Sequence, residues 1–222
     1  MHILAGTFKG RRLSFPKEYR IRPTTGLVRK ALFDLLAGKI PESFFLDLYA
    51  GTGLVGLEAL SRGAQKVVLV ESNLKVLECL KKNVELIQSS LLTREIAPRF
   101  SSPLAGEVRW GASLRGFVLY RKPVEKALSR LERNGAEFDI IFADPPYSFN
   151  EGKISGLIGR IASSKLLKPD GIFILQHQTG IEKKPDFQKG LAGLSIRVET
   201  RRYGSTSLSL MKDGAVKKKN VI

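Results

Sequence analysis

Short apolar runs alternate with amphipathic stretches along most of this chain, and this alternation limits the folds that the chain can adopt. The apolar runs occupy residues 44–49, 66–70, 116–120, 138–143 and 171–176. Stretches with helical spacing of apolar residues follow several of them, at residues 54–62, 73–87 and 123–133. Strands that alternate with helices predict a parallel sheet with helices on both faces. We therefore expect an α/β fold of the Rossmann-like type.

The two ends of the chain depart from this alternation. Residues 194–202 and 207–211 predict a final antiparallel pair of strands. Residues 1–22 alternate basic and apolar positions around two glycines, which predicts short strands or an extended hairpin arm. At 222 residues the chain can bury one substantial core, so we expect a single domain over residues 1–222.

One helix and one long segment complete the predicted organisation. After Thr24 and Thr25, a helix is predicted whose apolar stripe contains Leu27, Ala31, Leu32, Leu35 and Leu36. Residues 88–115 have no period and contain two prolines, which predicts an insertion or surface loop. This segment is either a basic loop that touches RNA or a tolerated passenger, and the small entropic cost of surface insertions favours the passenger.

The charge balance predicts a polyanionic partner. The net charge is +16 and the pI is about 10.1, with basic residues concentrated in residues 1–30, on 197–202 and in a basic tail at 214–222. Counterion release makes nucleic acid the expected partner of such a chain. If both ends lie side by side in the fold, they form one basic patch.

Cysteine usage and apolar content predict the compartment. Cys79 is the single cysteine, so an intrachain disulfide is impossible, and a reduced, cytoplasmic location is expected. Residues 1–8 lack the apolar core of a secretion signal, and no apolar run approaches the ~20 residues of a membrane span. Cys and His spacing typical of a metal site is absent, so no metal is expected.

A glycine-rich loop joins the first predicted strand to its helix. Gly51, Gly53 and Gly56 satisfy the G-x-G-x-x-G spacing, and glycines let the backbone approach a ligand closely. Taken alone, this pattern is shared by nicotinamide, flavin and S-adenosylmethionine sites.

Two carboxylates separate these cofactors. Glu71 ends the second strand about twenty residues after the loop, the position that accepts hydrogen bonds from a ribose diol. Asp47 precedes the loop and favours a cationic ligand over a pyrophosphate. S-adenosylmethionine carries an ammonium and a sulfonium group and no phosphate, so it is the favoured cofactor. The alternative is that both carboxylates only cap helices or hydrogen-bond loops.

The tetrapeptide Asp144, Pro145, Pro146 and Tyr147 follows the fourth strand and can hold a planar amino group. Prolines lack N–H donors, so the carbonyls there can face a ligand. Asp144 can accept N–H groups of an exocyclic amine, and Tyr147 offers a face on which a base can stack. An ordinary loop after a strand is the alternative. Because the ends of strands one and four lie beside the switch point of a doubly wound sheet, the glycine loop and this tetrapeptide are expected to face each other.

These motifs together resemble the RsmD family, bacterial methyltransferases that act on the exocyclic N2 of a guanine in 16S ribosomal RNA. The resemblance covers the chain except residues 88–115 and rests on residues 6–12, 22–25, 28–33, 47–63, Glu71 and 144–147. It implies a class I methyltransferase fold with a seven-stranded sheet whose last strand is antiparallel, and a short basic arm at the N-terminus. It also implies S-adenosylmethionine as donor and a small-subunit assembly intermediate as substrate. A monomer is the default expectation for the oligomeric state.

The resemblance also implies roles for individual residues. On the donor side, the residues concerned are Asp47, Ala50, Gly51, Gly53, Glu71 and Thr24. The RNA contacts are assigned to Lys9, Arg11, Arg12 and Arg22. Catalysis is assigned to residues 144–147.

Three other functions remain compatible with parts of the sequence. An adenine-N6 methyltransferase on nucleic acid could use the same tetrapeptide, although no large target-recognition domain is visible. A non-catalytic RNA-binding or ribosome-assembly factor could retain the scaffold without binding the donor. A nicotinamide-dependent oxidoreductase could use the glycine loop, but it leaves residues 144–147 unexplained.

Overall fold

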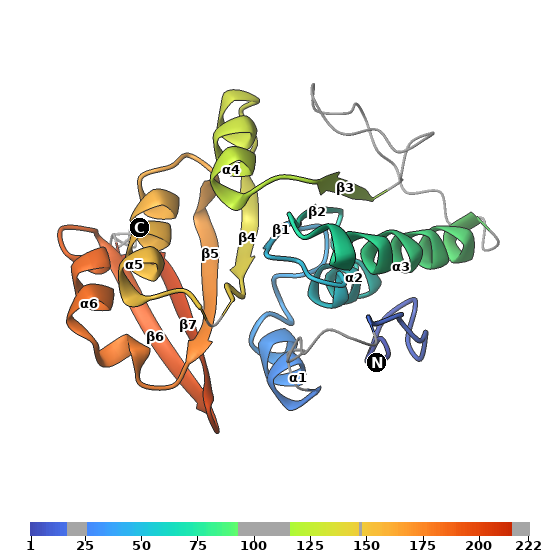
Figure 1. Ribbon diagram of the computed structural model, residues 1–222, viewed down its shortest axis with the longest axis horizontal. Coiled ribbons are helices and arrows are strands. Elements are labelled where there is room, and N and C mark those ends of the chain that lie inside the picture. Colours follow the sequence, from blue (N-terminus) through green and yellow to red (C-terminus); the bar gives the residue numbers. More distant parts are fainter. Residues whose placement is uncertain (17–25, 93–115, 147, 215–222) are drawn as a thin grey trace, which may run out of the picture.

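The computed structural model describes residues 1–16, 26–92, 116–146 and 148–214 (Figure 1). Its strands are β1 (Phe44–Leu48), β2 (Lys66–Val70), β3 (Phe117–Tyr120), β4 (Phe138–Ala143), β5 (Leu167–Gln178), β6 (Ile196–Tyr203) and β7 (Thr206–Asp213). Its helices are α1 (Gly26–Leu35), α2 (Leu54–Ser61), α3 (Leu74–Leu92), α4 (Val124–Arg133), α5 (Glu151–Ala162), the 3-10 helix η1 (Ile181–Lys183) and α6 (Pro185–Leu191).

The strands form one seven-stranded sheet in the order β3-β2-β1-β4-β5-β7-β6. The pairs among β1 to β5 are parallel, and β7 runs antiparallel to both β5 and β6. The chain order reverses between β1 and β4, which makes the carboxyl edge of these two strands the switch point where ligands bind in such sheets. The predicted seven-stranded α/β fold with an antiparallel last strand is confirmed.

Two apolar layers cover the sheet. The first layer contains the buried residues of α1, α2 and α3, and the second contains those of α4, α5 and α6. Alternate residues of one strand supply both layers, as Phe45 and Leu46 of β1 do, because successive side chains of a strand point to opposite faces. Since both faces are covered, the parallel strands are almost continuously apolar.

Most of the predicted elements lie where the sequence placed them, and three expectations were wrong. Helix α3 continues to Leu92, so the start of the segment 88–115 is helical, and residues 93–115 lie outside the described residues. Strand β5 begins at Leu167 instead of residue 171, since a register shift against β4 keeps the earlier residues paired. On the predicted stripe of α1, Leu32 and Leu36 are buried as expected, but Leu27 is 69% exposed and Val28 and Phe33 are buried instead. Helices α5 and α6 were not foreseen.

The N-terminal segment is a compact hairpin that packs on the first layer. One isolated antiparallel bridge joins His2 to Arg12, so the predicted arm has no extended strand pair within residues 1–16. The buried Glu58 carboxylate of α2 accepts hydrogen bonds from the backbone N–H groups of Leu4 (2.7 Å) and Ala5 (3.0 Å) and from Arg62 Nε (2.8 Å). The hairpin is therefore fastened to α2 by one buried carboxylate.

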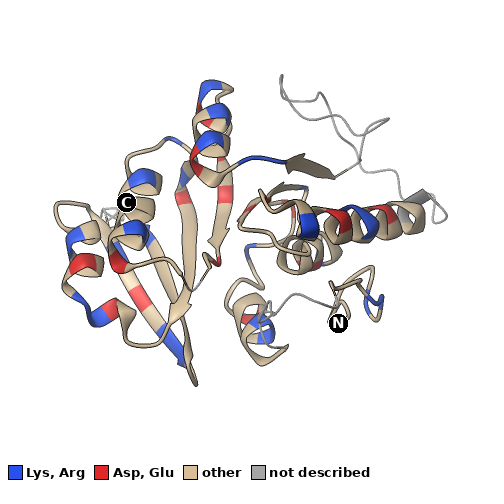
Figure 2. Ribbon diagram, in the orientation of Figure 1, with Lys and Arg blue, Asp and Glu red and all other residues tan. Residues whose placement is uncertain are grey.

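Among the residues that the structure describes, the basic residues of the two ends of the chain do not form one patch. The hairpin packs near α2 and α3, whereas Arg197, Arg201 and Arg202 belong to β6 at the opposite edge of the sheet (Figure 2). Residues 215–222 lie outside the described residues. For the described residues the prediction of a single patch fails, because the strand order places β1, β4, β5 and β7 between β2, on which α2 packs, and β6.

The edge strand β6 carries charged residues on its exposed side. The outer positions of β6 include Arg197, Glu199 and Arg201, all exposed, and charges on an edge strand oppose pairing with another sheet. Within the residues that the structure describes, none of the helices has the length and apolar character needed to cross a membrane.

Replacing Glu58 with Ala should lower the free energy of unfolding by about 3–5 kcal/mol, because it leaves buried N–H donors and the buried Arg29 without their carboxylate. Arg29 Nε lies 3.9 Å from Glu58, and both side chains are almost fully buried. Urea denaturation measures the change. Glu78→Ala on α3 is the matched control, since its side chain is 65% exposed, and it should leave the stability nearly unchanged. Similar losses in both variants would contradict the assigned role.

Candidate active site

The ends of β1 and β4 lie side by side at the switch point. The two strands pair in parallel, with Leu48 opposite Ala143, so the glycine loop and Asp144 leave the sheet next to each other. The predicted proximity of the loop and residues 144–146 is confirmed by this register. Tyr147 lies outside the described residues, so its stacking role stays a prediction.

The glycine loop turns sharply with its backbone in the left-handed region. Its φ angles are 64° at Tyr49, 57° at Gly51 and 82° at Gly53. A Cβ atom at Gly53 would lie 2.4 Å from Leu80 Cδ1 of α3, so a larger residue would have to move the Leu80 side chain as well as adopt the positive φ. The positive φ of Tyr49 is uncommon for a residue with a side chain, and such strain concentrates at functional sites.

Asp47 points from β1 toward the start of α2. Its side chain is nearly inaccessible to solvent, at 1% exposure, and its Oδ2 accepts the N–H of Gly56 at 2.9 Å. Burial raises the pKa of Asp47 well above its usual value; the Gly56 hydrogen bond opposes this, and the nearby carboxylates of Asp144 and Glu71 add to it.

Glu71 ends β2 and holds the loop from the other side. Its Oε2 accepts the N–H of Gly51 at 2.8 Å, and its Oε1 accepts the N–H groups of Ser72 (2.8 Å) and Asn73 (2.7 Å). The capping and loop hydrogen bonds considered from the sequence are therefore present for both Asp47 and Glu71. A carboxylate has about four acceptor positions, so these bonds leave Glu71 capacity for a ribose hydroxyl.

The three acidic side chains around the loop make the site locally negative. Asp47, Glu71 and Asp144 interact electrostatically in an otherwise basic protein. Bringing like charges together at a partly buried edge costs free energy, which a cation bound there would recover. This arrangement fits a ligand with ammonium and sulfonium groups and opposes a pyrophosphate.

Residues 144–146 form a tight exit from β4. Asp144 is half-buried, Pro145 is buried and Pro146 is exposed. The carbonyl of Pro146 accepts the N–H of Phe149 at 2.8 Å, which closes the turn. Asp144 Oδ2 accepts a hydrogen bond from Gln176 Nε2 of β5 at 2.8 Å. Gln176 was not predicted from the sequence, although it is a polar residue at an apolar position of its strand.

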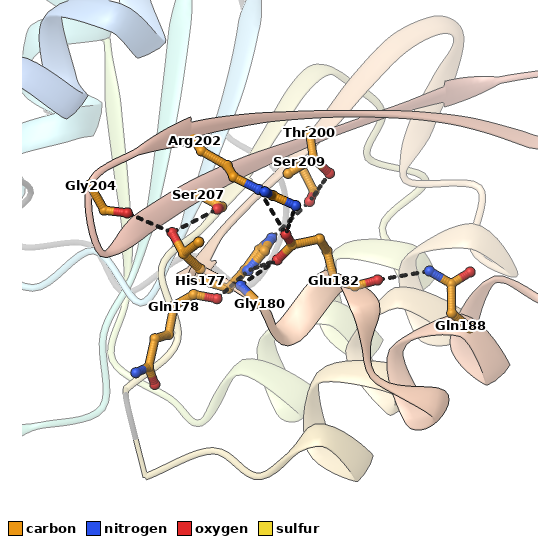
Figure 3. A network of polar contacts seen from close by, with 11 residues as sticks. His177, Gln178, Gly180, Glu182, Gln188, Thr200, Arg202, Gly204, Ser207 and Ser209 are labelled. Atoms are coloured by element: carbon orange, nitrogen blue, oxygen red, sulfur yellow. Dashed lines mark hydrogen bonds and ion pairs between the residues drawn. The ribbon is translucent and has the colours of Figure 1, made fainter.

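A second polar network lies just beyond Gln176 (Figure 3). His177 is buried, with its Nε2 2.7 Å from Ser209 Oγ of β7. Glu182 of η1 accepts the N–H of Gly180 at 2.8 Å and pairs with Arg202 of β6. Burial lowers the pKa of His177, so the ring is neutral near pH 7. The network fastens the end of β5 to the hairpin of β6 and β7.

A cleft of about 560 Å³ adjoins this exit. It lies between residues 149–152, which follow β4, and residues 178–181, which follow β5. Phe149 lines it and packs edge-on against Tyr49, with ring centroids 5.6 Å apart. The cleft is thus lined by the segment that follows residues 144–146 and by the end of β5.

The predicted RNA-contact residues are partly described. Lys9, Arg11 and Arg12 are all exposed on the hairpin, whereas Arg22, like the donor residue Thr24, lies outside the described part of the chain. Asn83 of α3, which the sequence did not single out, joins the hairpin to the glycine loop. Its amide exchanges two hydrogen bonds with the backbone of Ser14 (2.6 and 3.0 Å) and donates to the Thr52 carbonyl (2.9 Å).

The chain matches one known protein family along most of its length. The family described as Conserved hypothetical protein 95 matches residues 1–106 and 111–212. The chain belongs to this family. The chain is 30% identical over 178 residues to the ribosomal RNA small subunit methyltransferase D of Escherichia coli K12, covering 80% of this chain and 75% of that protein. The resemblance to the RsmD family is thereby confirmed.

Solved structures with the same fold include members of several methyltransferase groups. A hypothetical protein of Thermus thermophilus superposes with a TM-score of 0.70 at 30% identity, over 96% of this chain and 99% of that one. The 16S rRNA N2 G1207 methyltransferase of T. thermophilus superposes with a TM-score of 0.59 at 21% identity, over 89% of this chain and 44% of that one. The second similarity establishes the class I methyltransferase fold alone.

Replacing Asp47 with Asn should stabilise the protein by about 0.5–2 kcal/mol at neutral pH and weaken donor binding. When the pKa of a carboxyl group is raised in the folded state, the folded protein loses stability as the pH rises through that pKa. The Asn side chain does not ionise, so the variant avoids this loss, and its amide oxygen can still accept the Gly56 N–H. Thermal unfolding from pH 4 to 8 measures the first effect, and calorimetric titration with S-adenosylmethionine measures the second. Asp34→Asn, at an exposed position of α1, is the control. Unchanged donor affinity in the Asp47 variant would contradict the site.

Proposed function

We propose that this chain transfers a methyl group from S-adenosylmethionine to the exocyclic N2 amine of a guanine in 16S ribosomal RNA, within a small-subunit assembly intermediate and as a monomer. The observation that carries the proposal is the register of β1 and β4. It brings a glycine loop with two acidic partners next to Asp144 and Pro145 at one sheet edge.

The general activity, methylation of ribosomal RNA with S-adenosylmethionine, rests on the family. Relatives named ribosomal RNA small subunit methyltransferase D reach 30% identity over about four fifths of the chain in both Escherichia coli and Haemophilus influenzae. The prediction of an S-adenosylmethionine-dependent rRNA methyltransferase is confirmed at this level. The guanine N2 atom and the assembly stage are the parts that we propose.

The donor site is assigned to the loop and its carboxylates. S-adenosylmethionine supplies a methyl group activated by a positively charged sulfonium. Glu71 is placed to accept the ribose hydroxyls, and Asp47 and Asp144 supply the negative potential that suits the charged end of the donor. The left-handed turn from Tyr49 to Gly53 lets the backbone of Ala50 and Gly51 approach the donor closely.

Asp144 is assigned to the substrate amine. The N2 lone pair of guanine is delocalised into the ring, so the amine must be oriented before it can attack a methyl group. The Asp144 carboxylate and the Pro145 carbonyl can accept its N–H bonds, which favours a pyramidal nitrogen whose lone pair points at the donor. A carboxylate also suits the guanine edge, where N1–H and N2–H are adjacent donors. After transfer, the acidic methylated nitrogen can release its proton to Asp144 or water.

The target base must leave its stack to reach Asp144, and the surrounding surface can compensate for that cost. Stacking on an aromatic side chain contributes about 1–3 kcal/mol per base, the role that we assign to Tyr147. Phe149, whose N–H donates to the Pro146 carbonyl, lines the cleft, and this cleft is assigned to the adjoining part of the nucleotide. Exposed Lys9, Arg11 and Arg12 lie on the hairpin that Asn83 ties to the donor loop, so RNA held there passes close to the site.

Asp144→Ala should reduce turnover by at least about 10²-fold while leaving the Kd of S-adenosylmethionine within about threefold, because the carboxylate positions the substrate amine and not the donor. Single-turnover transfer of labelled methyl and calorimetric titration measure the two quantities. Asp139→Ala, near the opposite end of β4, is a control of the same chemical change. Turnover that survives in the Asp144 variant would overturn the assigned mechanism.

Substituting Lys9, Arg11 and Arg12 together by Ala should weaken RNA binding and reduce the slope of log K against log salt concentration by about 2, since each phosphate contact contributes about 0.7 for single strands. Filter binding at several salt concentrations measures the slope. A matched triple substitution of Lys126, Arg130 and Arg133, on α4 at the other face, should leave the slope unchanged. Equal slopes for both triple variants would contradict the assigned RNA contacts.

The substrate class is tested by offering the protein three substrates with the same labelled donor. Small-subunit particles that lack the modification should accept methyl, whereas duplex DNA of matched length should not. Free 16S RNA should react more slowly than the particles if an assembly intermediate is the substrate. Preferential transfer to duplex DNA would refute the proposal, and absence of both transfer and donor binding would favour a non-catalytic scaffold.

A further inference from the structure

Gln176 stands out because it is a buried polar side chain in an apolar row. Ile172 and Ile174 of β5 point to the same face of the sheet as Gln176 and belong to the first apolar layer. Leu208 of β7, which pairs with Gln176, belongs to the same layer. Gln176 itself is only 4% exposed. A leucine would continue this row, so the presence of an amide calls for a separate reason.

The amide makes one defined contact, and that contact is with Asp144. Residues Ala143 and Leu175 pair in register, so Asp144 and Gln176 lie next to each other where β4 and β5 approach the active edge. Gln176 Nε2 donates to Asp144 Oδ2 at 2.8 Å. Its other polar atom, Oε1, is buried and has no hydrogen-bond partner among the residues that the structure describes.

These two facts fix the orientation of the amide. If the amide were turned over, two oxygen atoms would face each other, so only Nε2 can lie against an ionised carboxylate. A buried carbonyl oxygen without a donor destabilises the folded state, and leucine would avoid that cost. The side chain is therefore unfavourable for folding at this position and favourable for holding Asp144.

We propose that Gln176 is a positioning residue for methyl transfer: its amide fixes the rotation of the Asp144 carboxylate so that this carboxylate meets the substrate amine in one orientation. The inference rests on the proposed function, because it assigns Gln176 a role through Asp144. The hydrogen bond from Gln176 uses one of the about four acceptor positions of the carboxylate.

The surroundings keep the amide in place. The next residue, His177, is buried against Ser209, and Glu182 with Arg202 fastens the segment after β5 to the neighbouring hairpin (Figure 3). The end of β5 is thus held from two sides. A carboxylate supported by such a rigid partner loses less freedom when the substrate binds.

Gln176→Leu separates this role from a purely structural one. The variant should keep or raise the Tm, because leucine fits the apolar row and removes the buried oxygen. Its kcat should fall by about 10- to 100-fold, the range expected for one lost hydrogen bond to a charged group, while the KM for RNA and the Kd for S-adenosylmethionine change less than about threefold. Gln176→Asn, which is one methylene too short to reach Asp144, should lose kcat similarly.

The control is Gln65→Leu, the same chemical change at the opposite end of the sheet, which should leave kcat unaltered. A lower Tm with unchanged kcat in Gln176→Leu would overturn the proposal, as would parallel increases in KM and Kd. Asp144→Ala, measured alongside, distinguishes failure of the proposed function from failure of the positioning role. If Asp144→Ala keeps full turnover, the proposed function fails, whatever the result for Gln176→Leu. Loss of turnover in Asp144→Ala together with wild-type kcat in Gln176→Leu and Gln176→Asn would refute the positioning role alone.

Discussion

The hydrogen bond from the Gly56 N–H to the buried Asp47 carboxylate determines how β1 passes into α2, and the site is arranged around it. It holds the start of α2 against the strand, so the chain between them must turn with left-handed backbone at Tyr49, Gly51 and Gly53. Glu71 then binds the same loop from β2. The protein's own hydrogen bonds shape the loop, which lowers the conformational cost of binding a ligand.

The protein carries charges of opposite sign toward its two substrates, positive toward RNA and negative toward S-adenosylmethionine. The whole chain carries +16, which attracts RNA over long distances, but the edge between β1, β2 and β4 gathers three carboxylates. A sulfonium and an ammonium suit that edge, whereas a phosphate does not. Asn83 hydrogen-bonds both the basic N-terminal hairpin and the glycine loop. The surface assigned to RNA is therefore attached directly to the loop assigned to the methyl donor.

Elements that are defined by a local pattern of apolar residues could be predicted from the sequence. The boundaries of β2 and β4 were predicted without error, because buried parallel strands are continuous apolar runs between turn residues. Asp47 and Glu71 could be placed at strand ends, but their bonds to Gly56 and Gly51 depend on the folded loop. The stripe on α1 was predicted only in part: Leu32 and Leu36 are buried, but the packing against Glu58 and Arg62 buries Arg29 and Phe33 in place of Leu27 and Leu35.

Long-range contacts explain what the sequence did not reveal. Gln176 became significant only when the register of β4 and β5 set it beside Asp144, 32 residues away. Likewise, the separation of the two basic ends follows from the order of the strands, which no local pattern encodes. The interruption of an apolar alternation by Gln176 was nevertheless visible, and a polar residue at the end of a buried strand is a signal worth weighing.

The most direct test of the central claim is to identify the methylated atom. Small-subunit particles that lack the modification are incubated with the protein and S-adenosylmethionine, and the 16S RNA is digested to nucleosides for mass spectrometry. The account predicts N2-methylguanosine, formed by the wild-type protein and not by Asp144→Ala. Formation of N6-methyladenosine, or of no methylated nucleoside while the donor is bound, would contradict it.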